Sequence, residues 1–137
     1  GDLMQHESQL RAARQPDGTY SYTPTYRHIK DYVSKADVAV ANLETTIAGK
    51  PYGGYPLFCA PDSFLYAVRD AGFDIMLLAN NHCLDRGKRG VERTIAMLDS
   101  LGYRHLTSKA ILAHTIGGIG AAFVAHWMYV LYSLIAL

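Results

Sequence analysis

Short apolar runs and helix-like segments alternate through the middle of the sequence, and this alternation constrains the fold more than any other feature. Strand-like runs occupy residues 37–44, 73–78 and 103–106. Two helix-like segments separate them, from Pro61 to Gly72 and from Gly90 to Leu101, and a glycine ends each one. Because the connections are short, this order predicts an α/β fold with a mainly parallel sheet and flanking helices.

A further helix is expected ahead of these elements, from Thr23 to about Ser34. Thr23 is a suitable helix cap, and Pro24 suits the first helical turn. The apolar side chains of this segment fall at three- and four-residue steps, at Tyr26, Ile29, Tyr32 and Val33. Such spacing places them on one face of a helix.

Size and charge narrow the class of protein. The chain has 137 residues, which is long enough for one domain with a hydrophobic core and too short for two domains that each have a sizeable core. Its net charge is +1 and no basic stripe stands out, so we expect no nucleic-acid partner. Cys59 and Cys83 form neither a CxxC pair nor a disulfide framework, and we expect two ordinary thiols.

Polar side chains follow two neighbouring strands at the point where each strand ends. Asn42 and Glu44 end the first strand-like run, and the Asn80–His82 segment follows the next one. Ligands of an open α/β sheet bind beyond the carboxyl ends of its strands, so we expect these groups to meet at one edge. Asp2 and His6 form a third group near the chain start, and Asp2 would join the same edge if Gly1 ends a strand. Otherwise they belong to a solvated chain end.

The donor types indicate the kind of ion that such an edge would bind. Carboxylates, carboxamide oxygens and imidazoles suit hard or borderline divalent cations, and we expect Mn²⁺, Fe²⁺, Zn²⁺ or Mg²⁺. Soft-metal chemistry is not expected, because the sequence has no cysteine pair.

Three blocks of the sequence, in order, resemble the CapA family of bacterial capsule and poly-γ-glutamate synthesis proteins, which belongs to the calcineurin-like metallophosphatase superfamily. The blocks read GDLMQH, ADVAVANLETTI and AGFDIMLLANNHCLDRG, with ERTIAMLDSLG following, and the resemblance covers residues 1–106. It implies a metallophosphatase-like α/β fold, truncated in this chain. It also implies a cell-envelope location, either secreted or membrane-anchored. No export signal precedes Gly1, and we expect an upstream segment to have been removed or lost.

The resemblance also assigns roles to individual residues. Asp2, Glu44 and Asn81 match metal ligands, and Asn42 lies beside Glu44 as a further ligand. His6 is an additional candidate ligand. His82 matches the catalytic histidine that protonates a leaving group or stabilises charge on a phosphoryl oxygen. Asp85 is a candidate catalytic partner, because a carboxylate fixes the tautomer of an imidazole and raises its basicity.

Two functions of different classes remain open from the sequence. One is metal-dependent hydrolysis of a phosphoester or other cell-envelope material during capsule or poly-γ-glutamate synthesis, in which two cations activate a water molecule. The other is a non-catalytic assembly factor that binds an anionic envelope polymer. An inactive truncated fragment is a third possibility, since the resemblance predicts later histidine ligands that the chain lacks.

The last part of the sequence departs from the family pattern. We expect a partial CapA-like metallophosphatase domain at residues 1–108 and an uncharged apolar tail at residues 109–137. From Ala110 to Leu137 there is no Asp, Glu, Lys or Arg, a length sufficient to span a bilayer. The tail is therefore a membrane span that associates the chain with the membrane, a buried hairpin, or the product of a frame change near Lys109.

Two local features lie beside the expected site. The segment from Arg86 to Gly90 places three cations just before a helix, where they oppose the helix dipole. A solvated basic loop and an anion-binding site both fit this pattern. Tyr52 and Tyr55 flank a Gly-Gly pair close after Glu44, where they are candidates to line a substrate groove.

Overall fold

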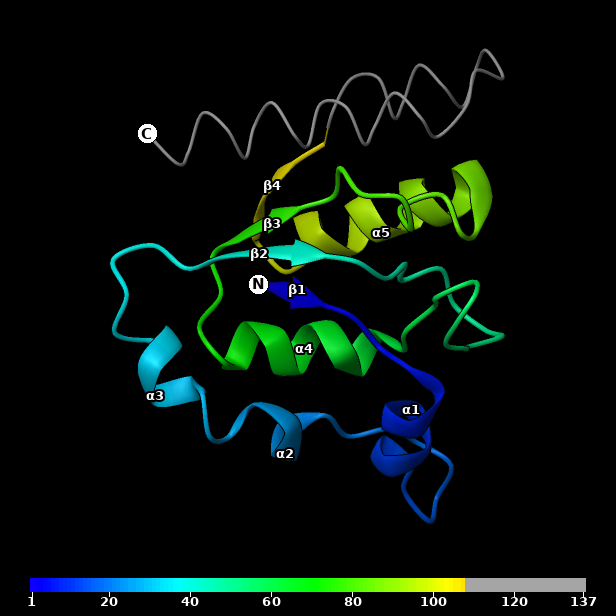
Figure 1. Cartoon of the computed structure of the whole chain (residues 1–137), viewed down its shortest axis with the longest axis horizontal. Helices are drawn as coiled ribbons and strands as arrows, with labels where there is room; N and C mark the ends of the chain where they lie inside the picture. The colour runs from blue at the N-terminus through cyan, green and yellow to red at the C-terminus, as the bar shows by residue number, and fades with distance from the viewer. Residues whose placement is uncertain (108–137) are drawn as a thin grey trace.

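The computed structural model describes residues 1–107, which form a four-stranded parallel sheet with helices around it (Figure 1). The strand order is β1-β2-β3-β4, and all three strand pairs are parallel. The predicted α/β fold is confirmed. The elements are β1 (Asp2–Leu3), α1 (Glu7–Ala13), α2 (Thr23–Tyr26), α3 (Lys30–Val33), β2 (Val40–Leu43), α4 (Asp62–Asp70), β3 (Ile75–Leu77), α5 (Gly87–Ser100) and β4 (Arg104–Leu106).

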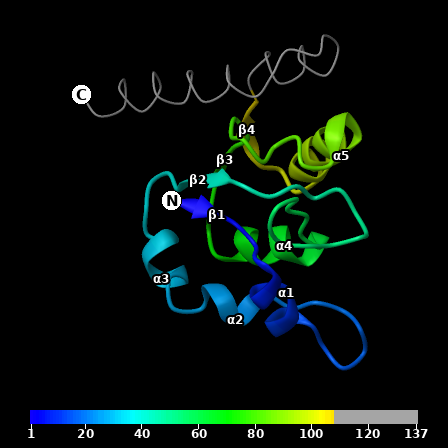
Figure 2. The same cartoon turned by 45° about the vertical axis from the view of Figure 1, so that its right-hand side comes forward.

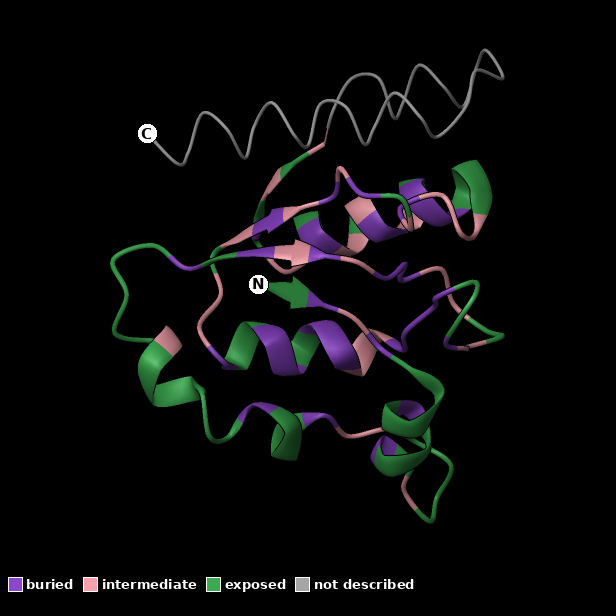
Figure 3. Cartoon of the chain, in the orientation of Figure 1, coloured by how far each residue is buried: buried purple, intermediate pink, exposed green. Residues whose placement is uncertain are grey.

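One face of the sheet carries the main core. Ala41 and Leu43 of β2 and Met76 of β3 are fully buried, and they form one cluster with residues of α4 and α5. Leu65 and Leu98 are the innermost side chains of these two helices, and both are fully buried. Figure 2 shows α4 and α5 on the same side of the sheet, and Figure 3 shows buried and exposed stretches alternating along α4. Burial of these apolar side chains is the dominant stabilising term of the fold.

The opposite face of the sheet is more exposed. Alternate residues of a strand point to opposite faces, and Val40 and Leu106, which share this face, are 44% and 62% exposed. Ile75 and Leu77 on the same face are only partly buried. The register aligns Asp2, Asn42, Leu77 and Leu106 in one row, so the polar site begins on this open face at the end of β1 and β2.

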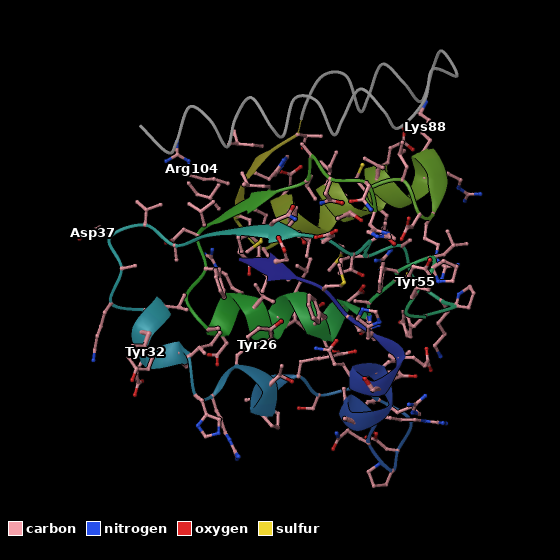
Figure 4. All side chains as sticks on the ribbon, in the orientation of Figure 1. Tyr26, Tyr32, Asp37, Tyr55, Lys88 and Arg104 are labelled. Carbon is pink, nitrogen blue, oxygen red and sulfur yellow. The ribbon has the colours of Figure 1, made fainter. Side chains whose placement is uncertain are left out.

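The N-terminal part of the chain departs from the sequence predictions in two places. A short helix, α1, follows the first strand and was not predicted. The single helix expected from Thr23 to about Ser34 is two short helices, α2 and α3. Tyr26 is buried, whereas Tyr32 is 80% exposed and extends away from the core (Figure 4). Short helices depend on tertiary packing for stability. Tyr26 of α2 has a core to pack against, whereas Tyr32 of α3 does not.

The later strands and helices begin or end a few residues away from their predicted boundaries. β2 and β3 are shorter than the predicted apolar runs, because only Val40–Leu43 and Ile75–Leu77 pair regularly with neighbours. Gly72 takes a positive φ of 99° directly after α4, as expected for a glycine that ends a helix. None of the helices in residues 1–107 is both long and apolar enough to cross a bilayer. The expected tail at residues 109–137 and its membrane association lie outside the described residues.

Candidate metal-binding and catalytic site

The carboxyl ends of β1, β2 and β3 point in the same direction, and their following loops meet on one side of the molecule (Figure 1). β1 pairs with β2 through Asn42 N–H to Gly1 O and Glu44 N–H to Leu3 O, both at 3.0 Å. Gly1 is therefore held beside β2, and Asp2 lies in register with Asn42. Gly1 does not end a strand, because β1 begins at Asp2, but the strand itself places Asp2 beside Asn42.

Asn42 joins the two carboxylates of this edge. Its Nδ2 donates to Asp2 Oδ1 at 2.9 Å and to Glu44 Oε2 at 3.1 Å. We expected Asn42 to be a metal ligand itself. In the structure its NH₂ group, not its oxygen, faces the carboxylates, because the oxygen accepts a hydrogen bond from Asn80. Asn42 therefore holds two acidic groups together rather than adding an oxygen ligand to them.

Asn80 connects β2 to the turn that carries the predicted histidine. It is 1% exposed, and its Nδ2 donates to Asn42 Oδ1 at 3.0 Å and to Leu43 O at 2.9 Å. Its Oδ1 accepts the backbone N–H of His82 at 3.0 Å. One buried carboxamide thus satisfies groups on both segments, since buried polar groups require partners. The backbone at His82 is fixed relative to Asn42 by this side chain.

His82 and Asp85 form a hydrogen-bonded pair on this turn. His82 Nδ1 lies 2.9 Å from Asp85 Oδ2, and their side chains are 16% and 9% exposed. The same carboxylate oxygen accepts the backbone N–H of Phe58 at 2.6 Å. Because a carboxylate only accepts, the proton of this pair belongs on Nδ1, which leaves Nε2 of the ring as the reactive nitrogen.

Phe58 separates the two histidines of the region. Its ring meets His82 edge-on at a centroid distance of 4.6 Å and His6 edge-on at 5.1 Å. Tyr55, which is 77% exposed, lies with its ring centroid 6.4 Å from that of Phe58 and marks this side of the molecule in Figure 4. Tyr52 instead packs against Tyr20. Of the two tyrosines proposed to line a groove, Tyr55 is the one whose ring approaches Phe58.

The loop after β2 is held on the chain segment around His6. Gln5 is fully buried, and its Nε2 donates to Cys59 O at 3.3 Å, while Tyr22 donates its hydroxyl hydrogen to Gln5 Oε1. Gly54 crosses the peptide after His6 so closely that a Cβ there would lie 2.5 Å from Glu7 N. His6 caps α1, and its backbone N–H donates to Gln9 Oε1. These contacts explain why Phe58 and His6 are neighbours.

The other charged groups of the site affect the pKa of the Glu44 carboxyl. Burial raises the pKa of the Glu44 carboxyl, and the carboxylates of Asp2 and Asp85 raise it further. His82 has the opposite effect on this pKa. Glu44 and Asp2 accept from the same Asn42 amide group, although β1 and β2 are far apart in the sequence. Two facing carboxylates of this kind are stabilised when a cation lies between them.

The arrangement brings together most, not all, of the predicted residues. Asp2, Asn42 and Glu44 form one cluster, and His82 and Asp85 form a pair next to it. Asn81 is exposed beside Asn80, and His6 contacts Phe58 rather than the carboxylates. Within residues 1–107, no three side chains among His, Cys, Asp and Glu converge closely enough to hold a metal ion by themselves. A cation here would therefore need carboxamide oxygens as well.

Sequence reasoning missed two residues that build the site. Asn80 was noted only as a strand-end residue, and burial is what distinguishes it from Asn81. Phe58 is 1% exposed in the structure. In the sequence it is an apolar residue shortly after the proline- and glycine-rich segment that follows Glu44, which is a weak indication of its role. An apolar residue within such a loop has a reason to be buried, but its partner is not visible in the sequence.

Comparisons with known proteins support the resemblance. The family model described as bacterial capsule synthesis protein PGA_cap matches residues 1–125. This match continues beyond residue 108, where the family pattern was expected to stop, and it takes in part of the uncharged segment. The capsule biosynthesis protein CapA of Bacillus anthracis is 28% identical over 101 residues, which are 69% of this chain and 24% of that protein.

Two further relatives come from Sinorhizobium fredii. The uncharacterized proteins y4sH and y4uA are each 35% identical over 91 residues, which are 60% of this chain and 20% of each protein. The chain thus spans about a fifth to a quarter of the length of the curated relatives it matches. The range that the family model matches contains the strand ends that carry Asp2, Glu44 and His82, and it covers most of the sequence. The chain belongs to the PGA_cap family of bacterial capsule synthesis proteins and is similar to CapA.

Proposed function

We propose that this chain carries the first part of a metal-dependent phosphohydrolase site that acts on cell-envelope material during capsule synthesis. One observation carries the proposal: a continuous hydrogen-bond chain joins the Asp2 and Glu44 carboxylates, through Asn42 and Asn80, to the turn with His82 and Asp85. Acidic oxygens and a carboxylate-supported imidazole are thereby held at one sheet edge. This is the combination that metal-assisted hydrolysis requires.

The donor chemistry fits a hard divalent cation. Asp2 and Glu44 offer carboxylate oxygens, and the exposed carboxamide of Asn81 is available from the loop after β3. Oxygen donors of this kind favour Mn²⁺ or Mg²⁺ over Zn²⁺, which favours nitrogen and sulfur donors. When bound, the cation would supply Lewis acidity at a phosphoryl oxygen and lower the pKa of a water molecule.

The chain itself would hold and move a proton at His82. Asp85 fixes the ring by accepting from Nδ1, and Phe58 limits its rotation by packing against it edge-on. In the imidazolium form, in which both ring nitrogens carry a proton, Nε2–H would donate its proton to a leaving oxygen or stabilise charge on a phosphoryl oxygen, and the ring would keep the Nδ1 proton that Asp85 accepts. Asp85 acts as a positioning residue in this account, because it touches the imidazole and not the substrate.

Mn²⁺ binding tests the proposal directly. In isothermal titration calorimetry, Asp2→Asn and Glu44→Gln should each weaken Mn²⁺ binding at least about tenfold, since each removes an anionic ligand. Asp31→Asn and Glu92→Gln are matched controls, because they remove the same charges from exposed positions on α3 and α5. Equal affinities in the site variants and the controls would contradict the proposal.

A second function is favoured by a separate observation. Cationic side chains gather beside the site, on the first turns of α5 and the loop after β2. They suit a factor that binds an anionic envelope polymer without catalysis. Polymer binding that survives both His82→Ala and Glu44→Ala would separate this function from the hydrolase.

A further inference from the structure

A basic hollow lies between the loop after β2 and the first two turns of α5. Its volume is about 300 Å³, and its cationic lining residues are Lys50, Arg86, Arg89 and Arg93. The rest of the lining comes from Ala48, Gly49, Pro51 and Gly90. Lys88, on the same first turn, marks this end of α5 in Figure 4. None of these residues belongs to the Asp2–Glu44 cluster or to the His82–Asp85 pair.

Glycines set the shape of the hollow. A Cβ on Gly90 would lie 2.5 Å from the Cβ of Arg86, so Gly90 leaves room for the Arg86 side chain, and it would lie 3.5 Å from the Cβ of Ala48 in the loop, an ordinary contact. Gly49 takes a positive φ of 82°, a conformation that other residues rarely adopt. It turns the loop at a point where its added Cβ would lie 3.8 Å from Arg93 Nε. The backbone therefore brings Lys50 opposite the arginines of α5.

Of the four cationic side chains that line the hollow, only Arg93 forms an ion pair with a carboxylate of residues 1–107. Arg93 holds the Asp62 carboxylate with both terminal nitrogens, at 2.8 and 2.9 Å, and donates to Ile47 O at 2.6 Å. Arg86 donates one Nη to Leu57 O at 3.3 Å, and its buried Nε has no partner among the described residues.

Lys50 and Arg89 are exposed, and neither has an acidic partner in residues 1–107. The nearby acid Glu92 pairs instead with Lys88, at 3.6 Å. The hollow therefore carries positive charge from Lys50, Arg86 and Arg89 that no carboxylate of the described chain compensates.

The direction of α5 strengthens this field. The hollow opens at the N-terminal end of a 14-residue helix, whose first turn contains no acidic residue and whose cap makes no side-chain hydrogen bond. Cations at this end oppose the helix dipole and destabilise the helix slightly. An anion would interact favourably with both the dipole and the cations, and arginine binds carboxylate and phosphate oxygens in a forked geometry.

We propose that the hollow formed by Lys50, Arg86, Arg89 and Arg93 binds an oxyanion group of an anionic polymer, a carboxylate or a phosphate. Arg93 and Asp62 form the fixed wall, and Lys50, Arg86 and Arg89 make the exchangeable contacts. The inference locates the polymer-binding function proposed above. It does not depend on catalysis, because the hollow shares no residue with the metal-binding and histidine groups.

Fluorescence anisotropy with two labelled probes, polyglutamate and polyphosphate, tests the proposal on the full chain. EDTA is present throughout, so that the result does not depend on cation binding at Asp2 and Glu44. The double variant Lys50→Gln/Arg89→Gln should bind at least one probe about tenfold more weakly than the unaltered chain. Polyglutamate binding identifies a carboxylate ligand, and polyphosphate binding identifies a phosphate ligand.

A matched double variant controls for net charge. Arg11→Gln/Lys35→Gln removes the same two charges from exposed positions on α1 and the loop before β2. It should leave the affinity within about twofold, because distant charges are screened at physiological salt. Equal weakening in the two double variants, or no binding of either probe by the folded, unaltered chain, would overturn the proposal. Neither result would bear on Mn²⁺ binding, so the hydrolase proposal is tested separately.

Discussion

His82→Ala should lower the Mn²⁺-dependent hydrolysis of a generic phosphodiester by about 10²- to 10⁴-fold, the usual contribution of general acid–base catalysis. The loss should fall on kcat, because the imidazole acts on charge that develops in the transition state. Bis(p-nitrophenyl) phosphate is a suitable substrate, since nitrophenolate release is followed by absorbance. Mn²⁺ binding should be retained, because the carboxylates of Asp2 and Glu44 remain.

Two further variants make this result specific. His28→Ala removes an exposed imidazole on the segment between α2 and α3, and it should leave the rate unchanged. Asp85→Asn should lower kcat by about 10- to 100-fold and change the pH profile, because the amide no longer fixes the proton on Nδ1 of His82. If His82→Ala and His28→Ala gave equal rates in folded protein, the catalytic role of His82 would be excluded.

Asn80→Ala should lower the free energy of unfolding by about 2–4 kcal/mol, the largest stability effect that we expect from a polar residue of the site. The substitution removes the donor to Leu43 O and Asn42 Oδ1 and the acceptor of the His82 N–H. These groups are then left without partners in the interior, where an unsatisfied polar group is costly. Urea denaturation followed by circular dichroism measures the change.

The neighbouring carboxamide provides a matched control. Asn81→Ala alters an exposed side chain, so stability should change by less than about 0.5 kcal/mol, while Mn²⁺ binding should weaken. Asn80→Ala is thus expected mainly to lower stability, and Asn81→Ala mainly to weaken Mn²⁺ binding. Equal losses of stability in both variants would show that the carboxamide hydrogen bonds of Asn80 do not fix this turn.

The order of the elements was predictable because it rests on periodicity and on glycine and proline positions, which are local properties. α4, α5 and the three later strands lie where the pattern of apolar residues predicts them, with small shifts at the ends. β1 was not predicted as a strand, since two residues are too few for any pattern. The segment after Thr23 was predicted as one helix because spacing alone does not tell whether Tyr32 has a surface to pack against.

The sequence predicts which edge of the sheet carries the site, but it does not predict the hydrogen bonds within the site. The topology rule places Asp2, Glu44 and the Asn80–His82 segment together, because parallel strands deliver their carboxyl ends to one side. Which carboxamide turns inward depends on burial, and the sequence shows two adjacent asparagines without distinguishing them. His6 was grouped with the metal ligands because of its chain position. Its contact with Phe58 arises from a loop closure over Gly54 that no local pattern reveals.

Paramagnetic broadening by Mn²⁺ in a ¹⁵N-resolved NMR spectrum tests most directly whether three strand ends surround one cation. At substoichiometric Mn²⁺, the amide signals of Asp2, Glu44 and Asn81 should broaden together, whereas those of α3 should remain sharp. Glu44→Gln should abolish all three effects at the same Mn²⁺ concentration. Broadening confined to one of the three segments, or centred elsewhere on the chain, would contradict the account.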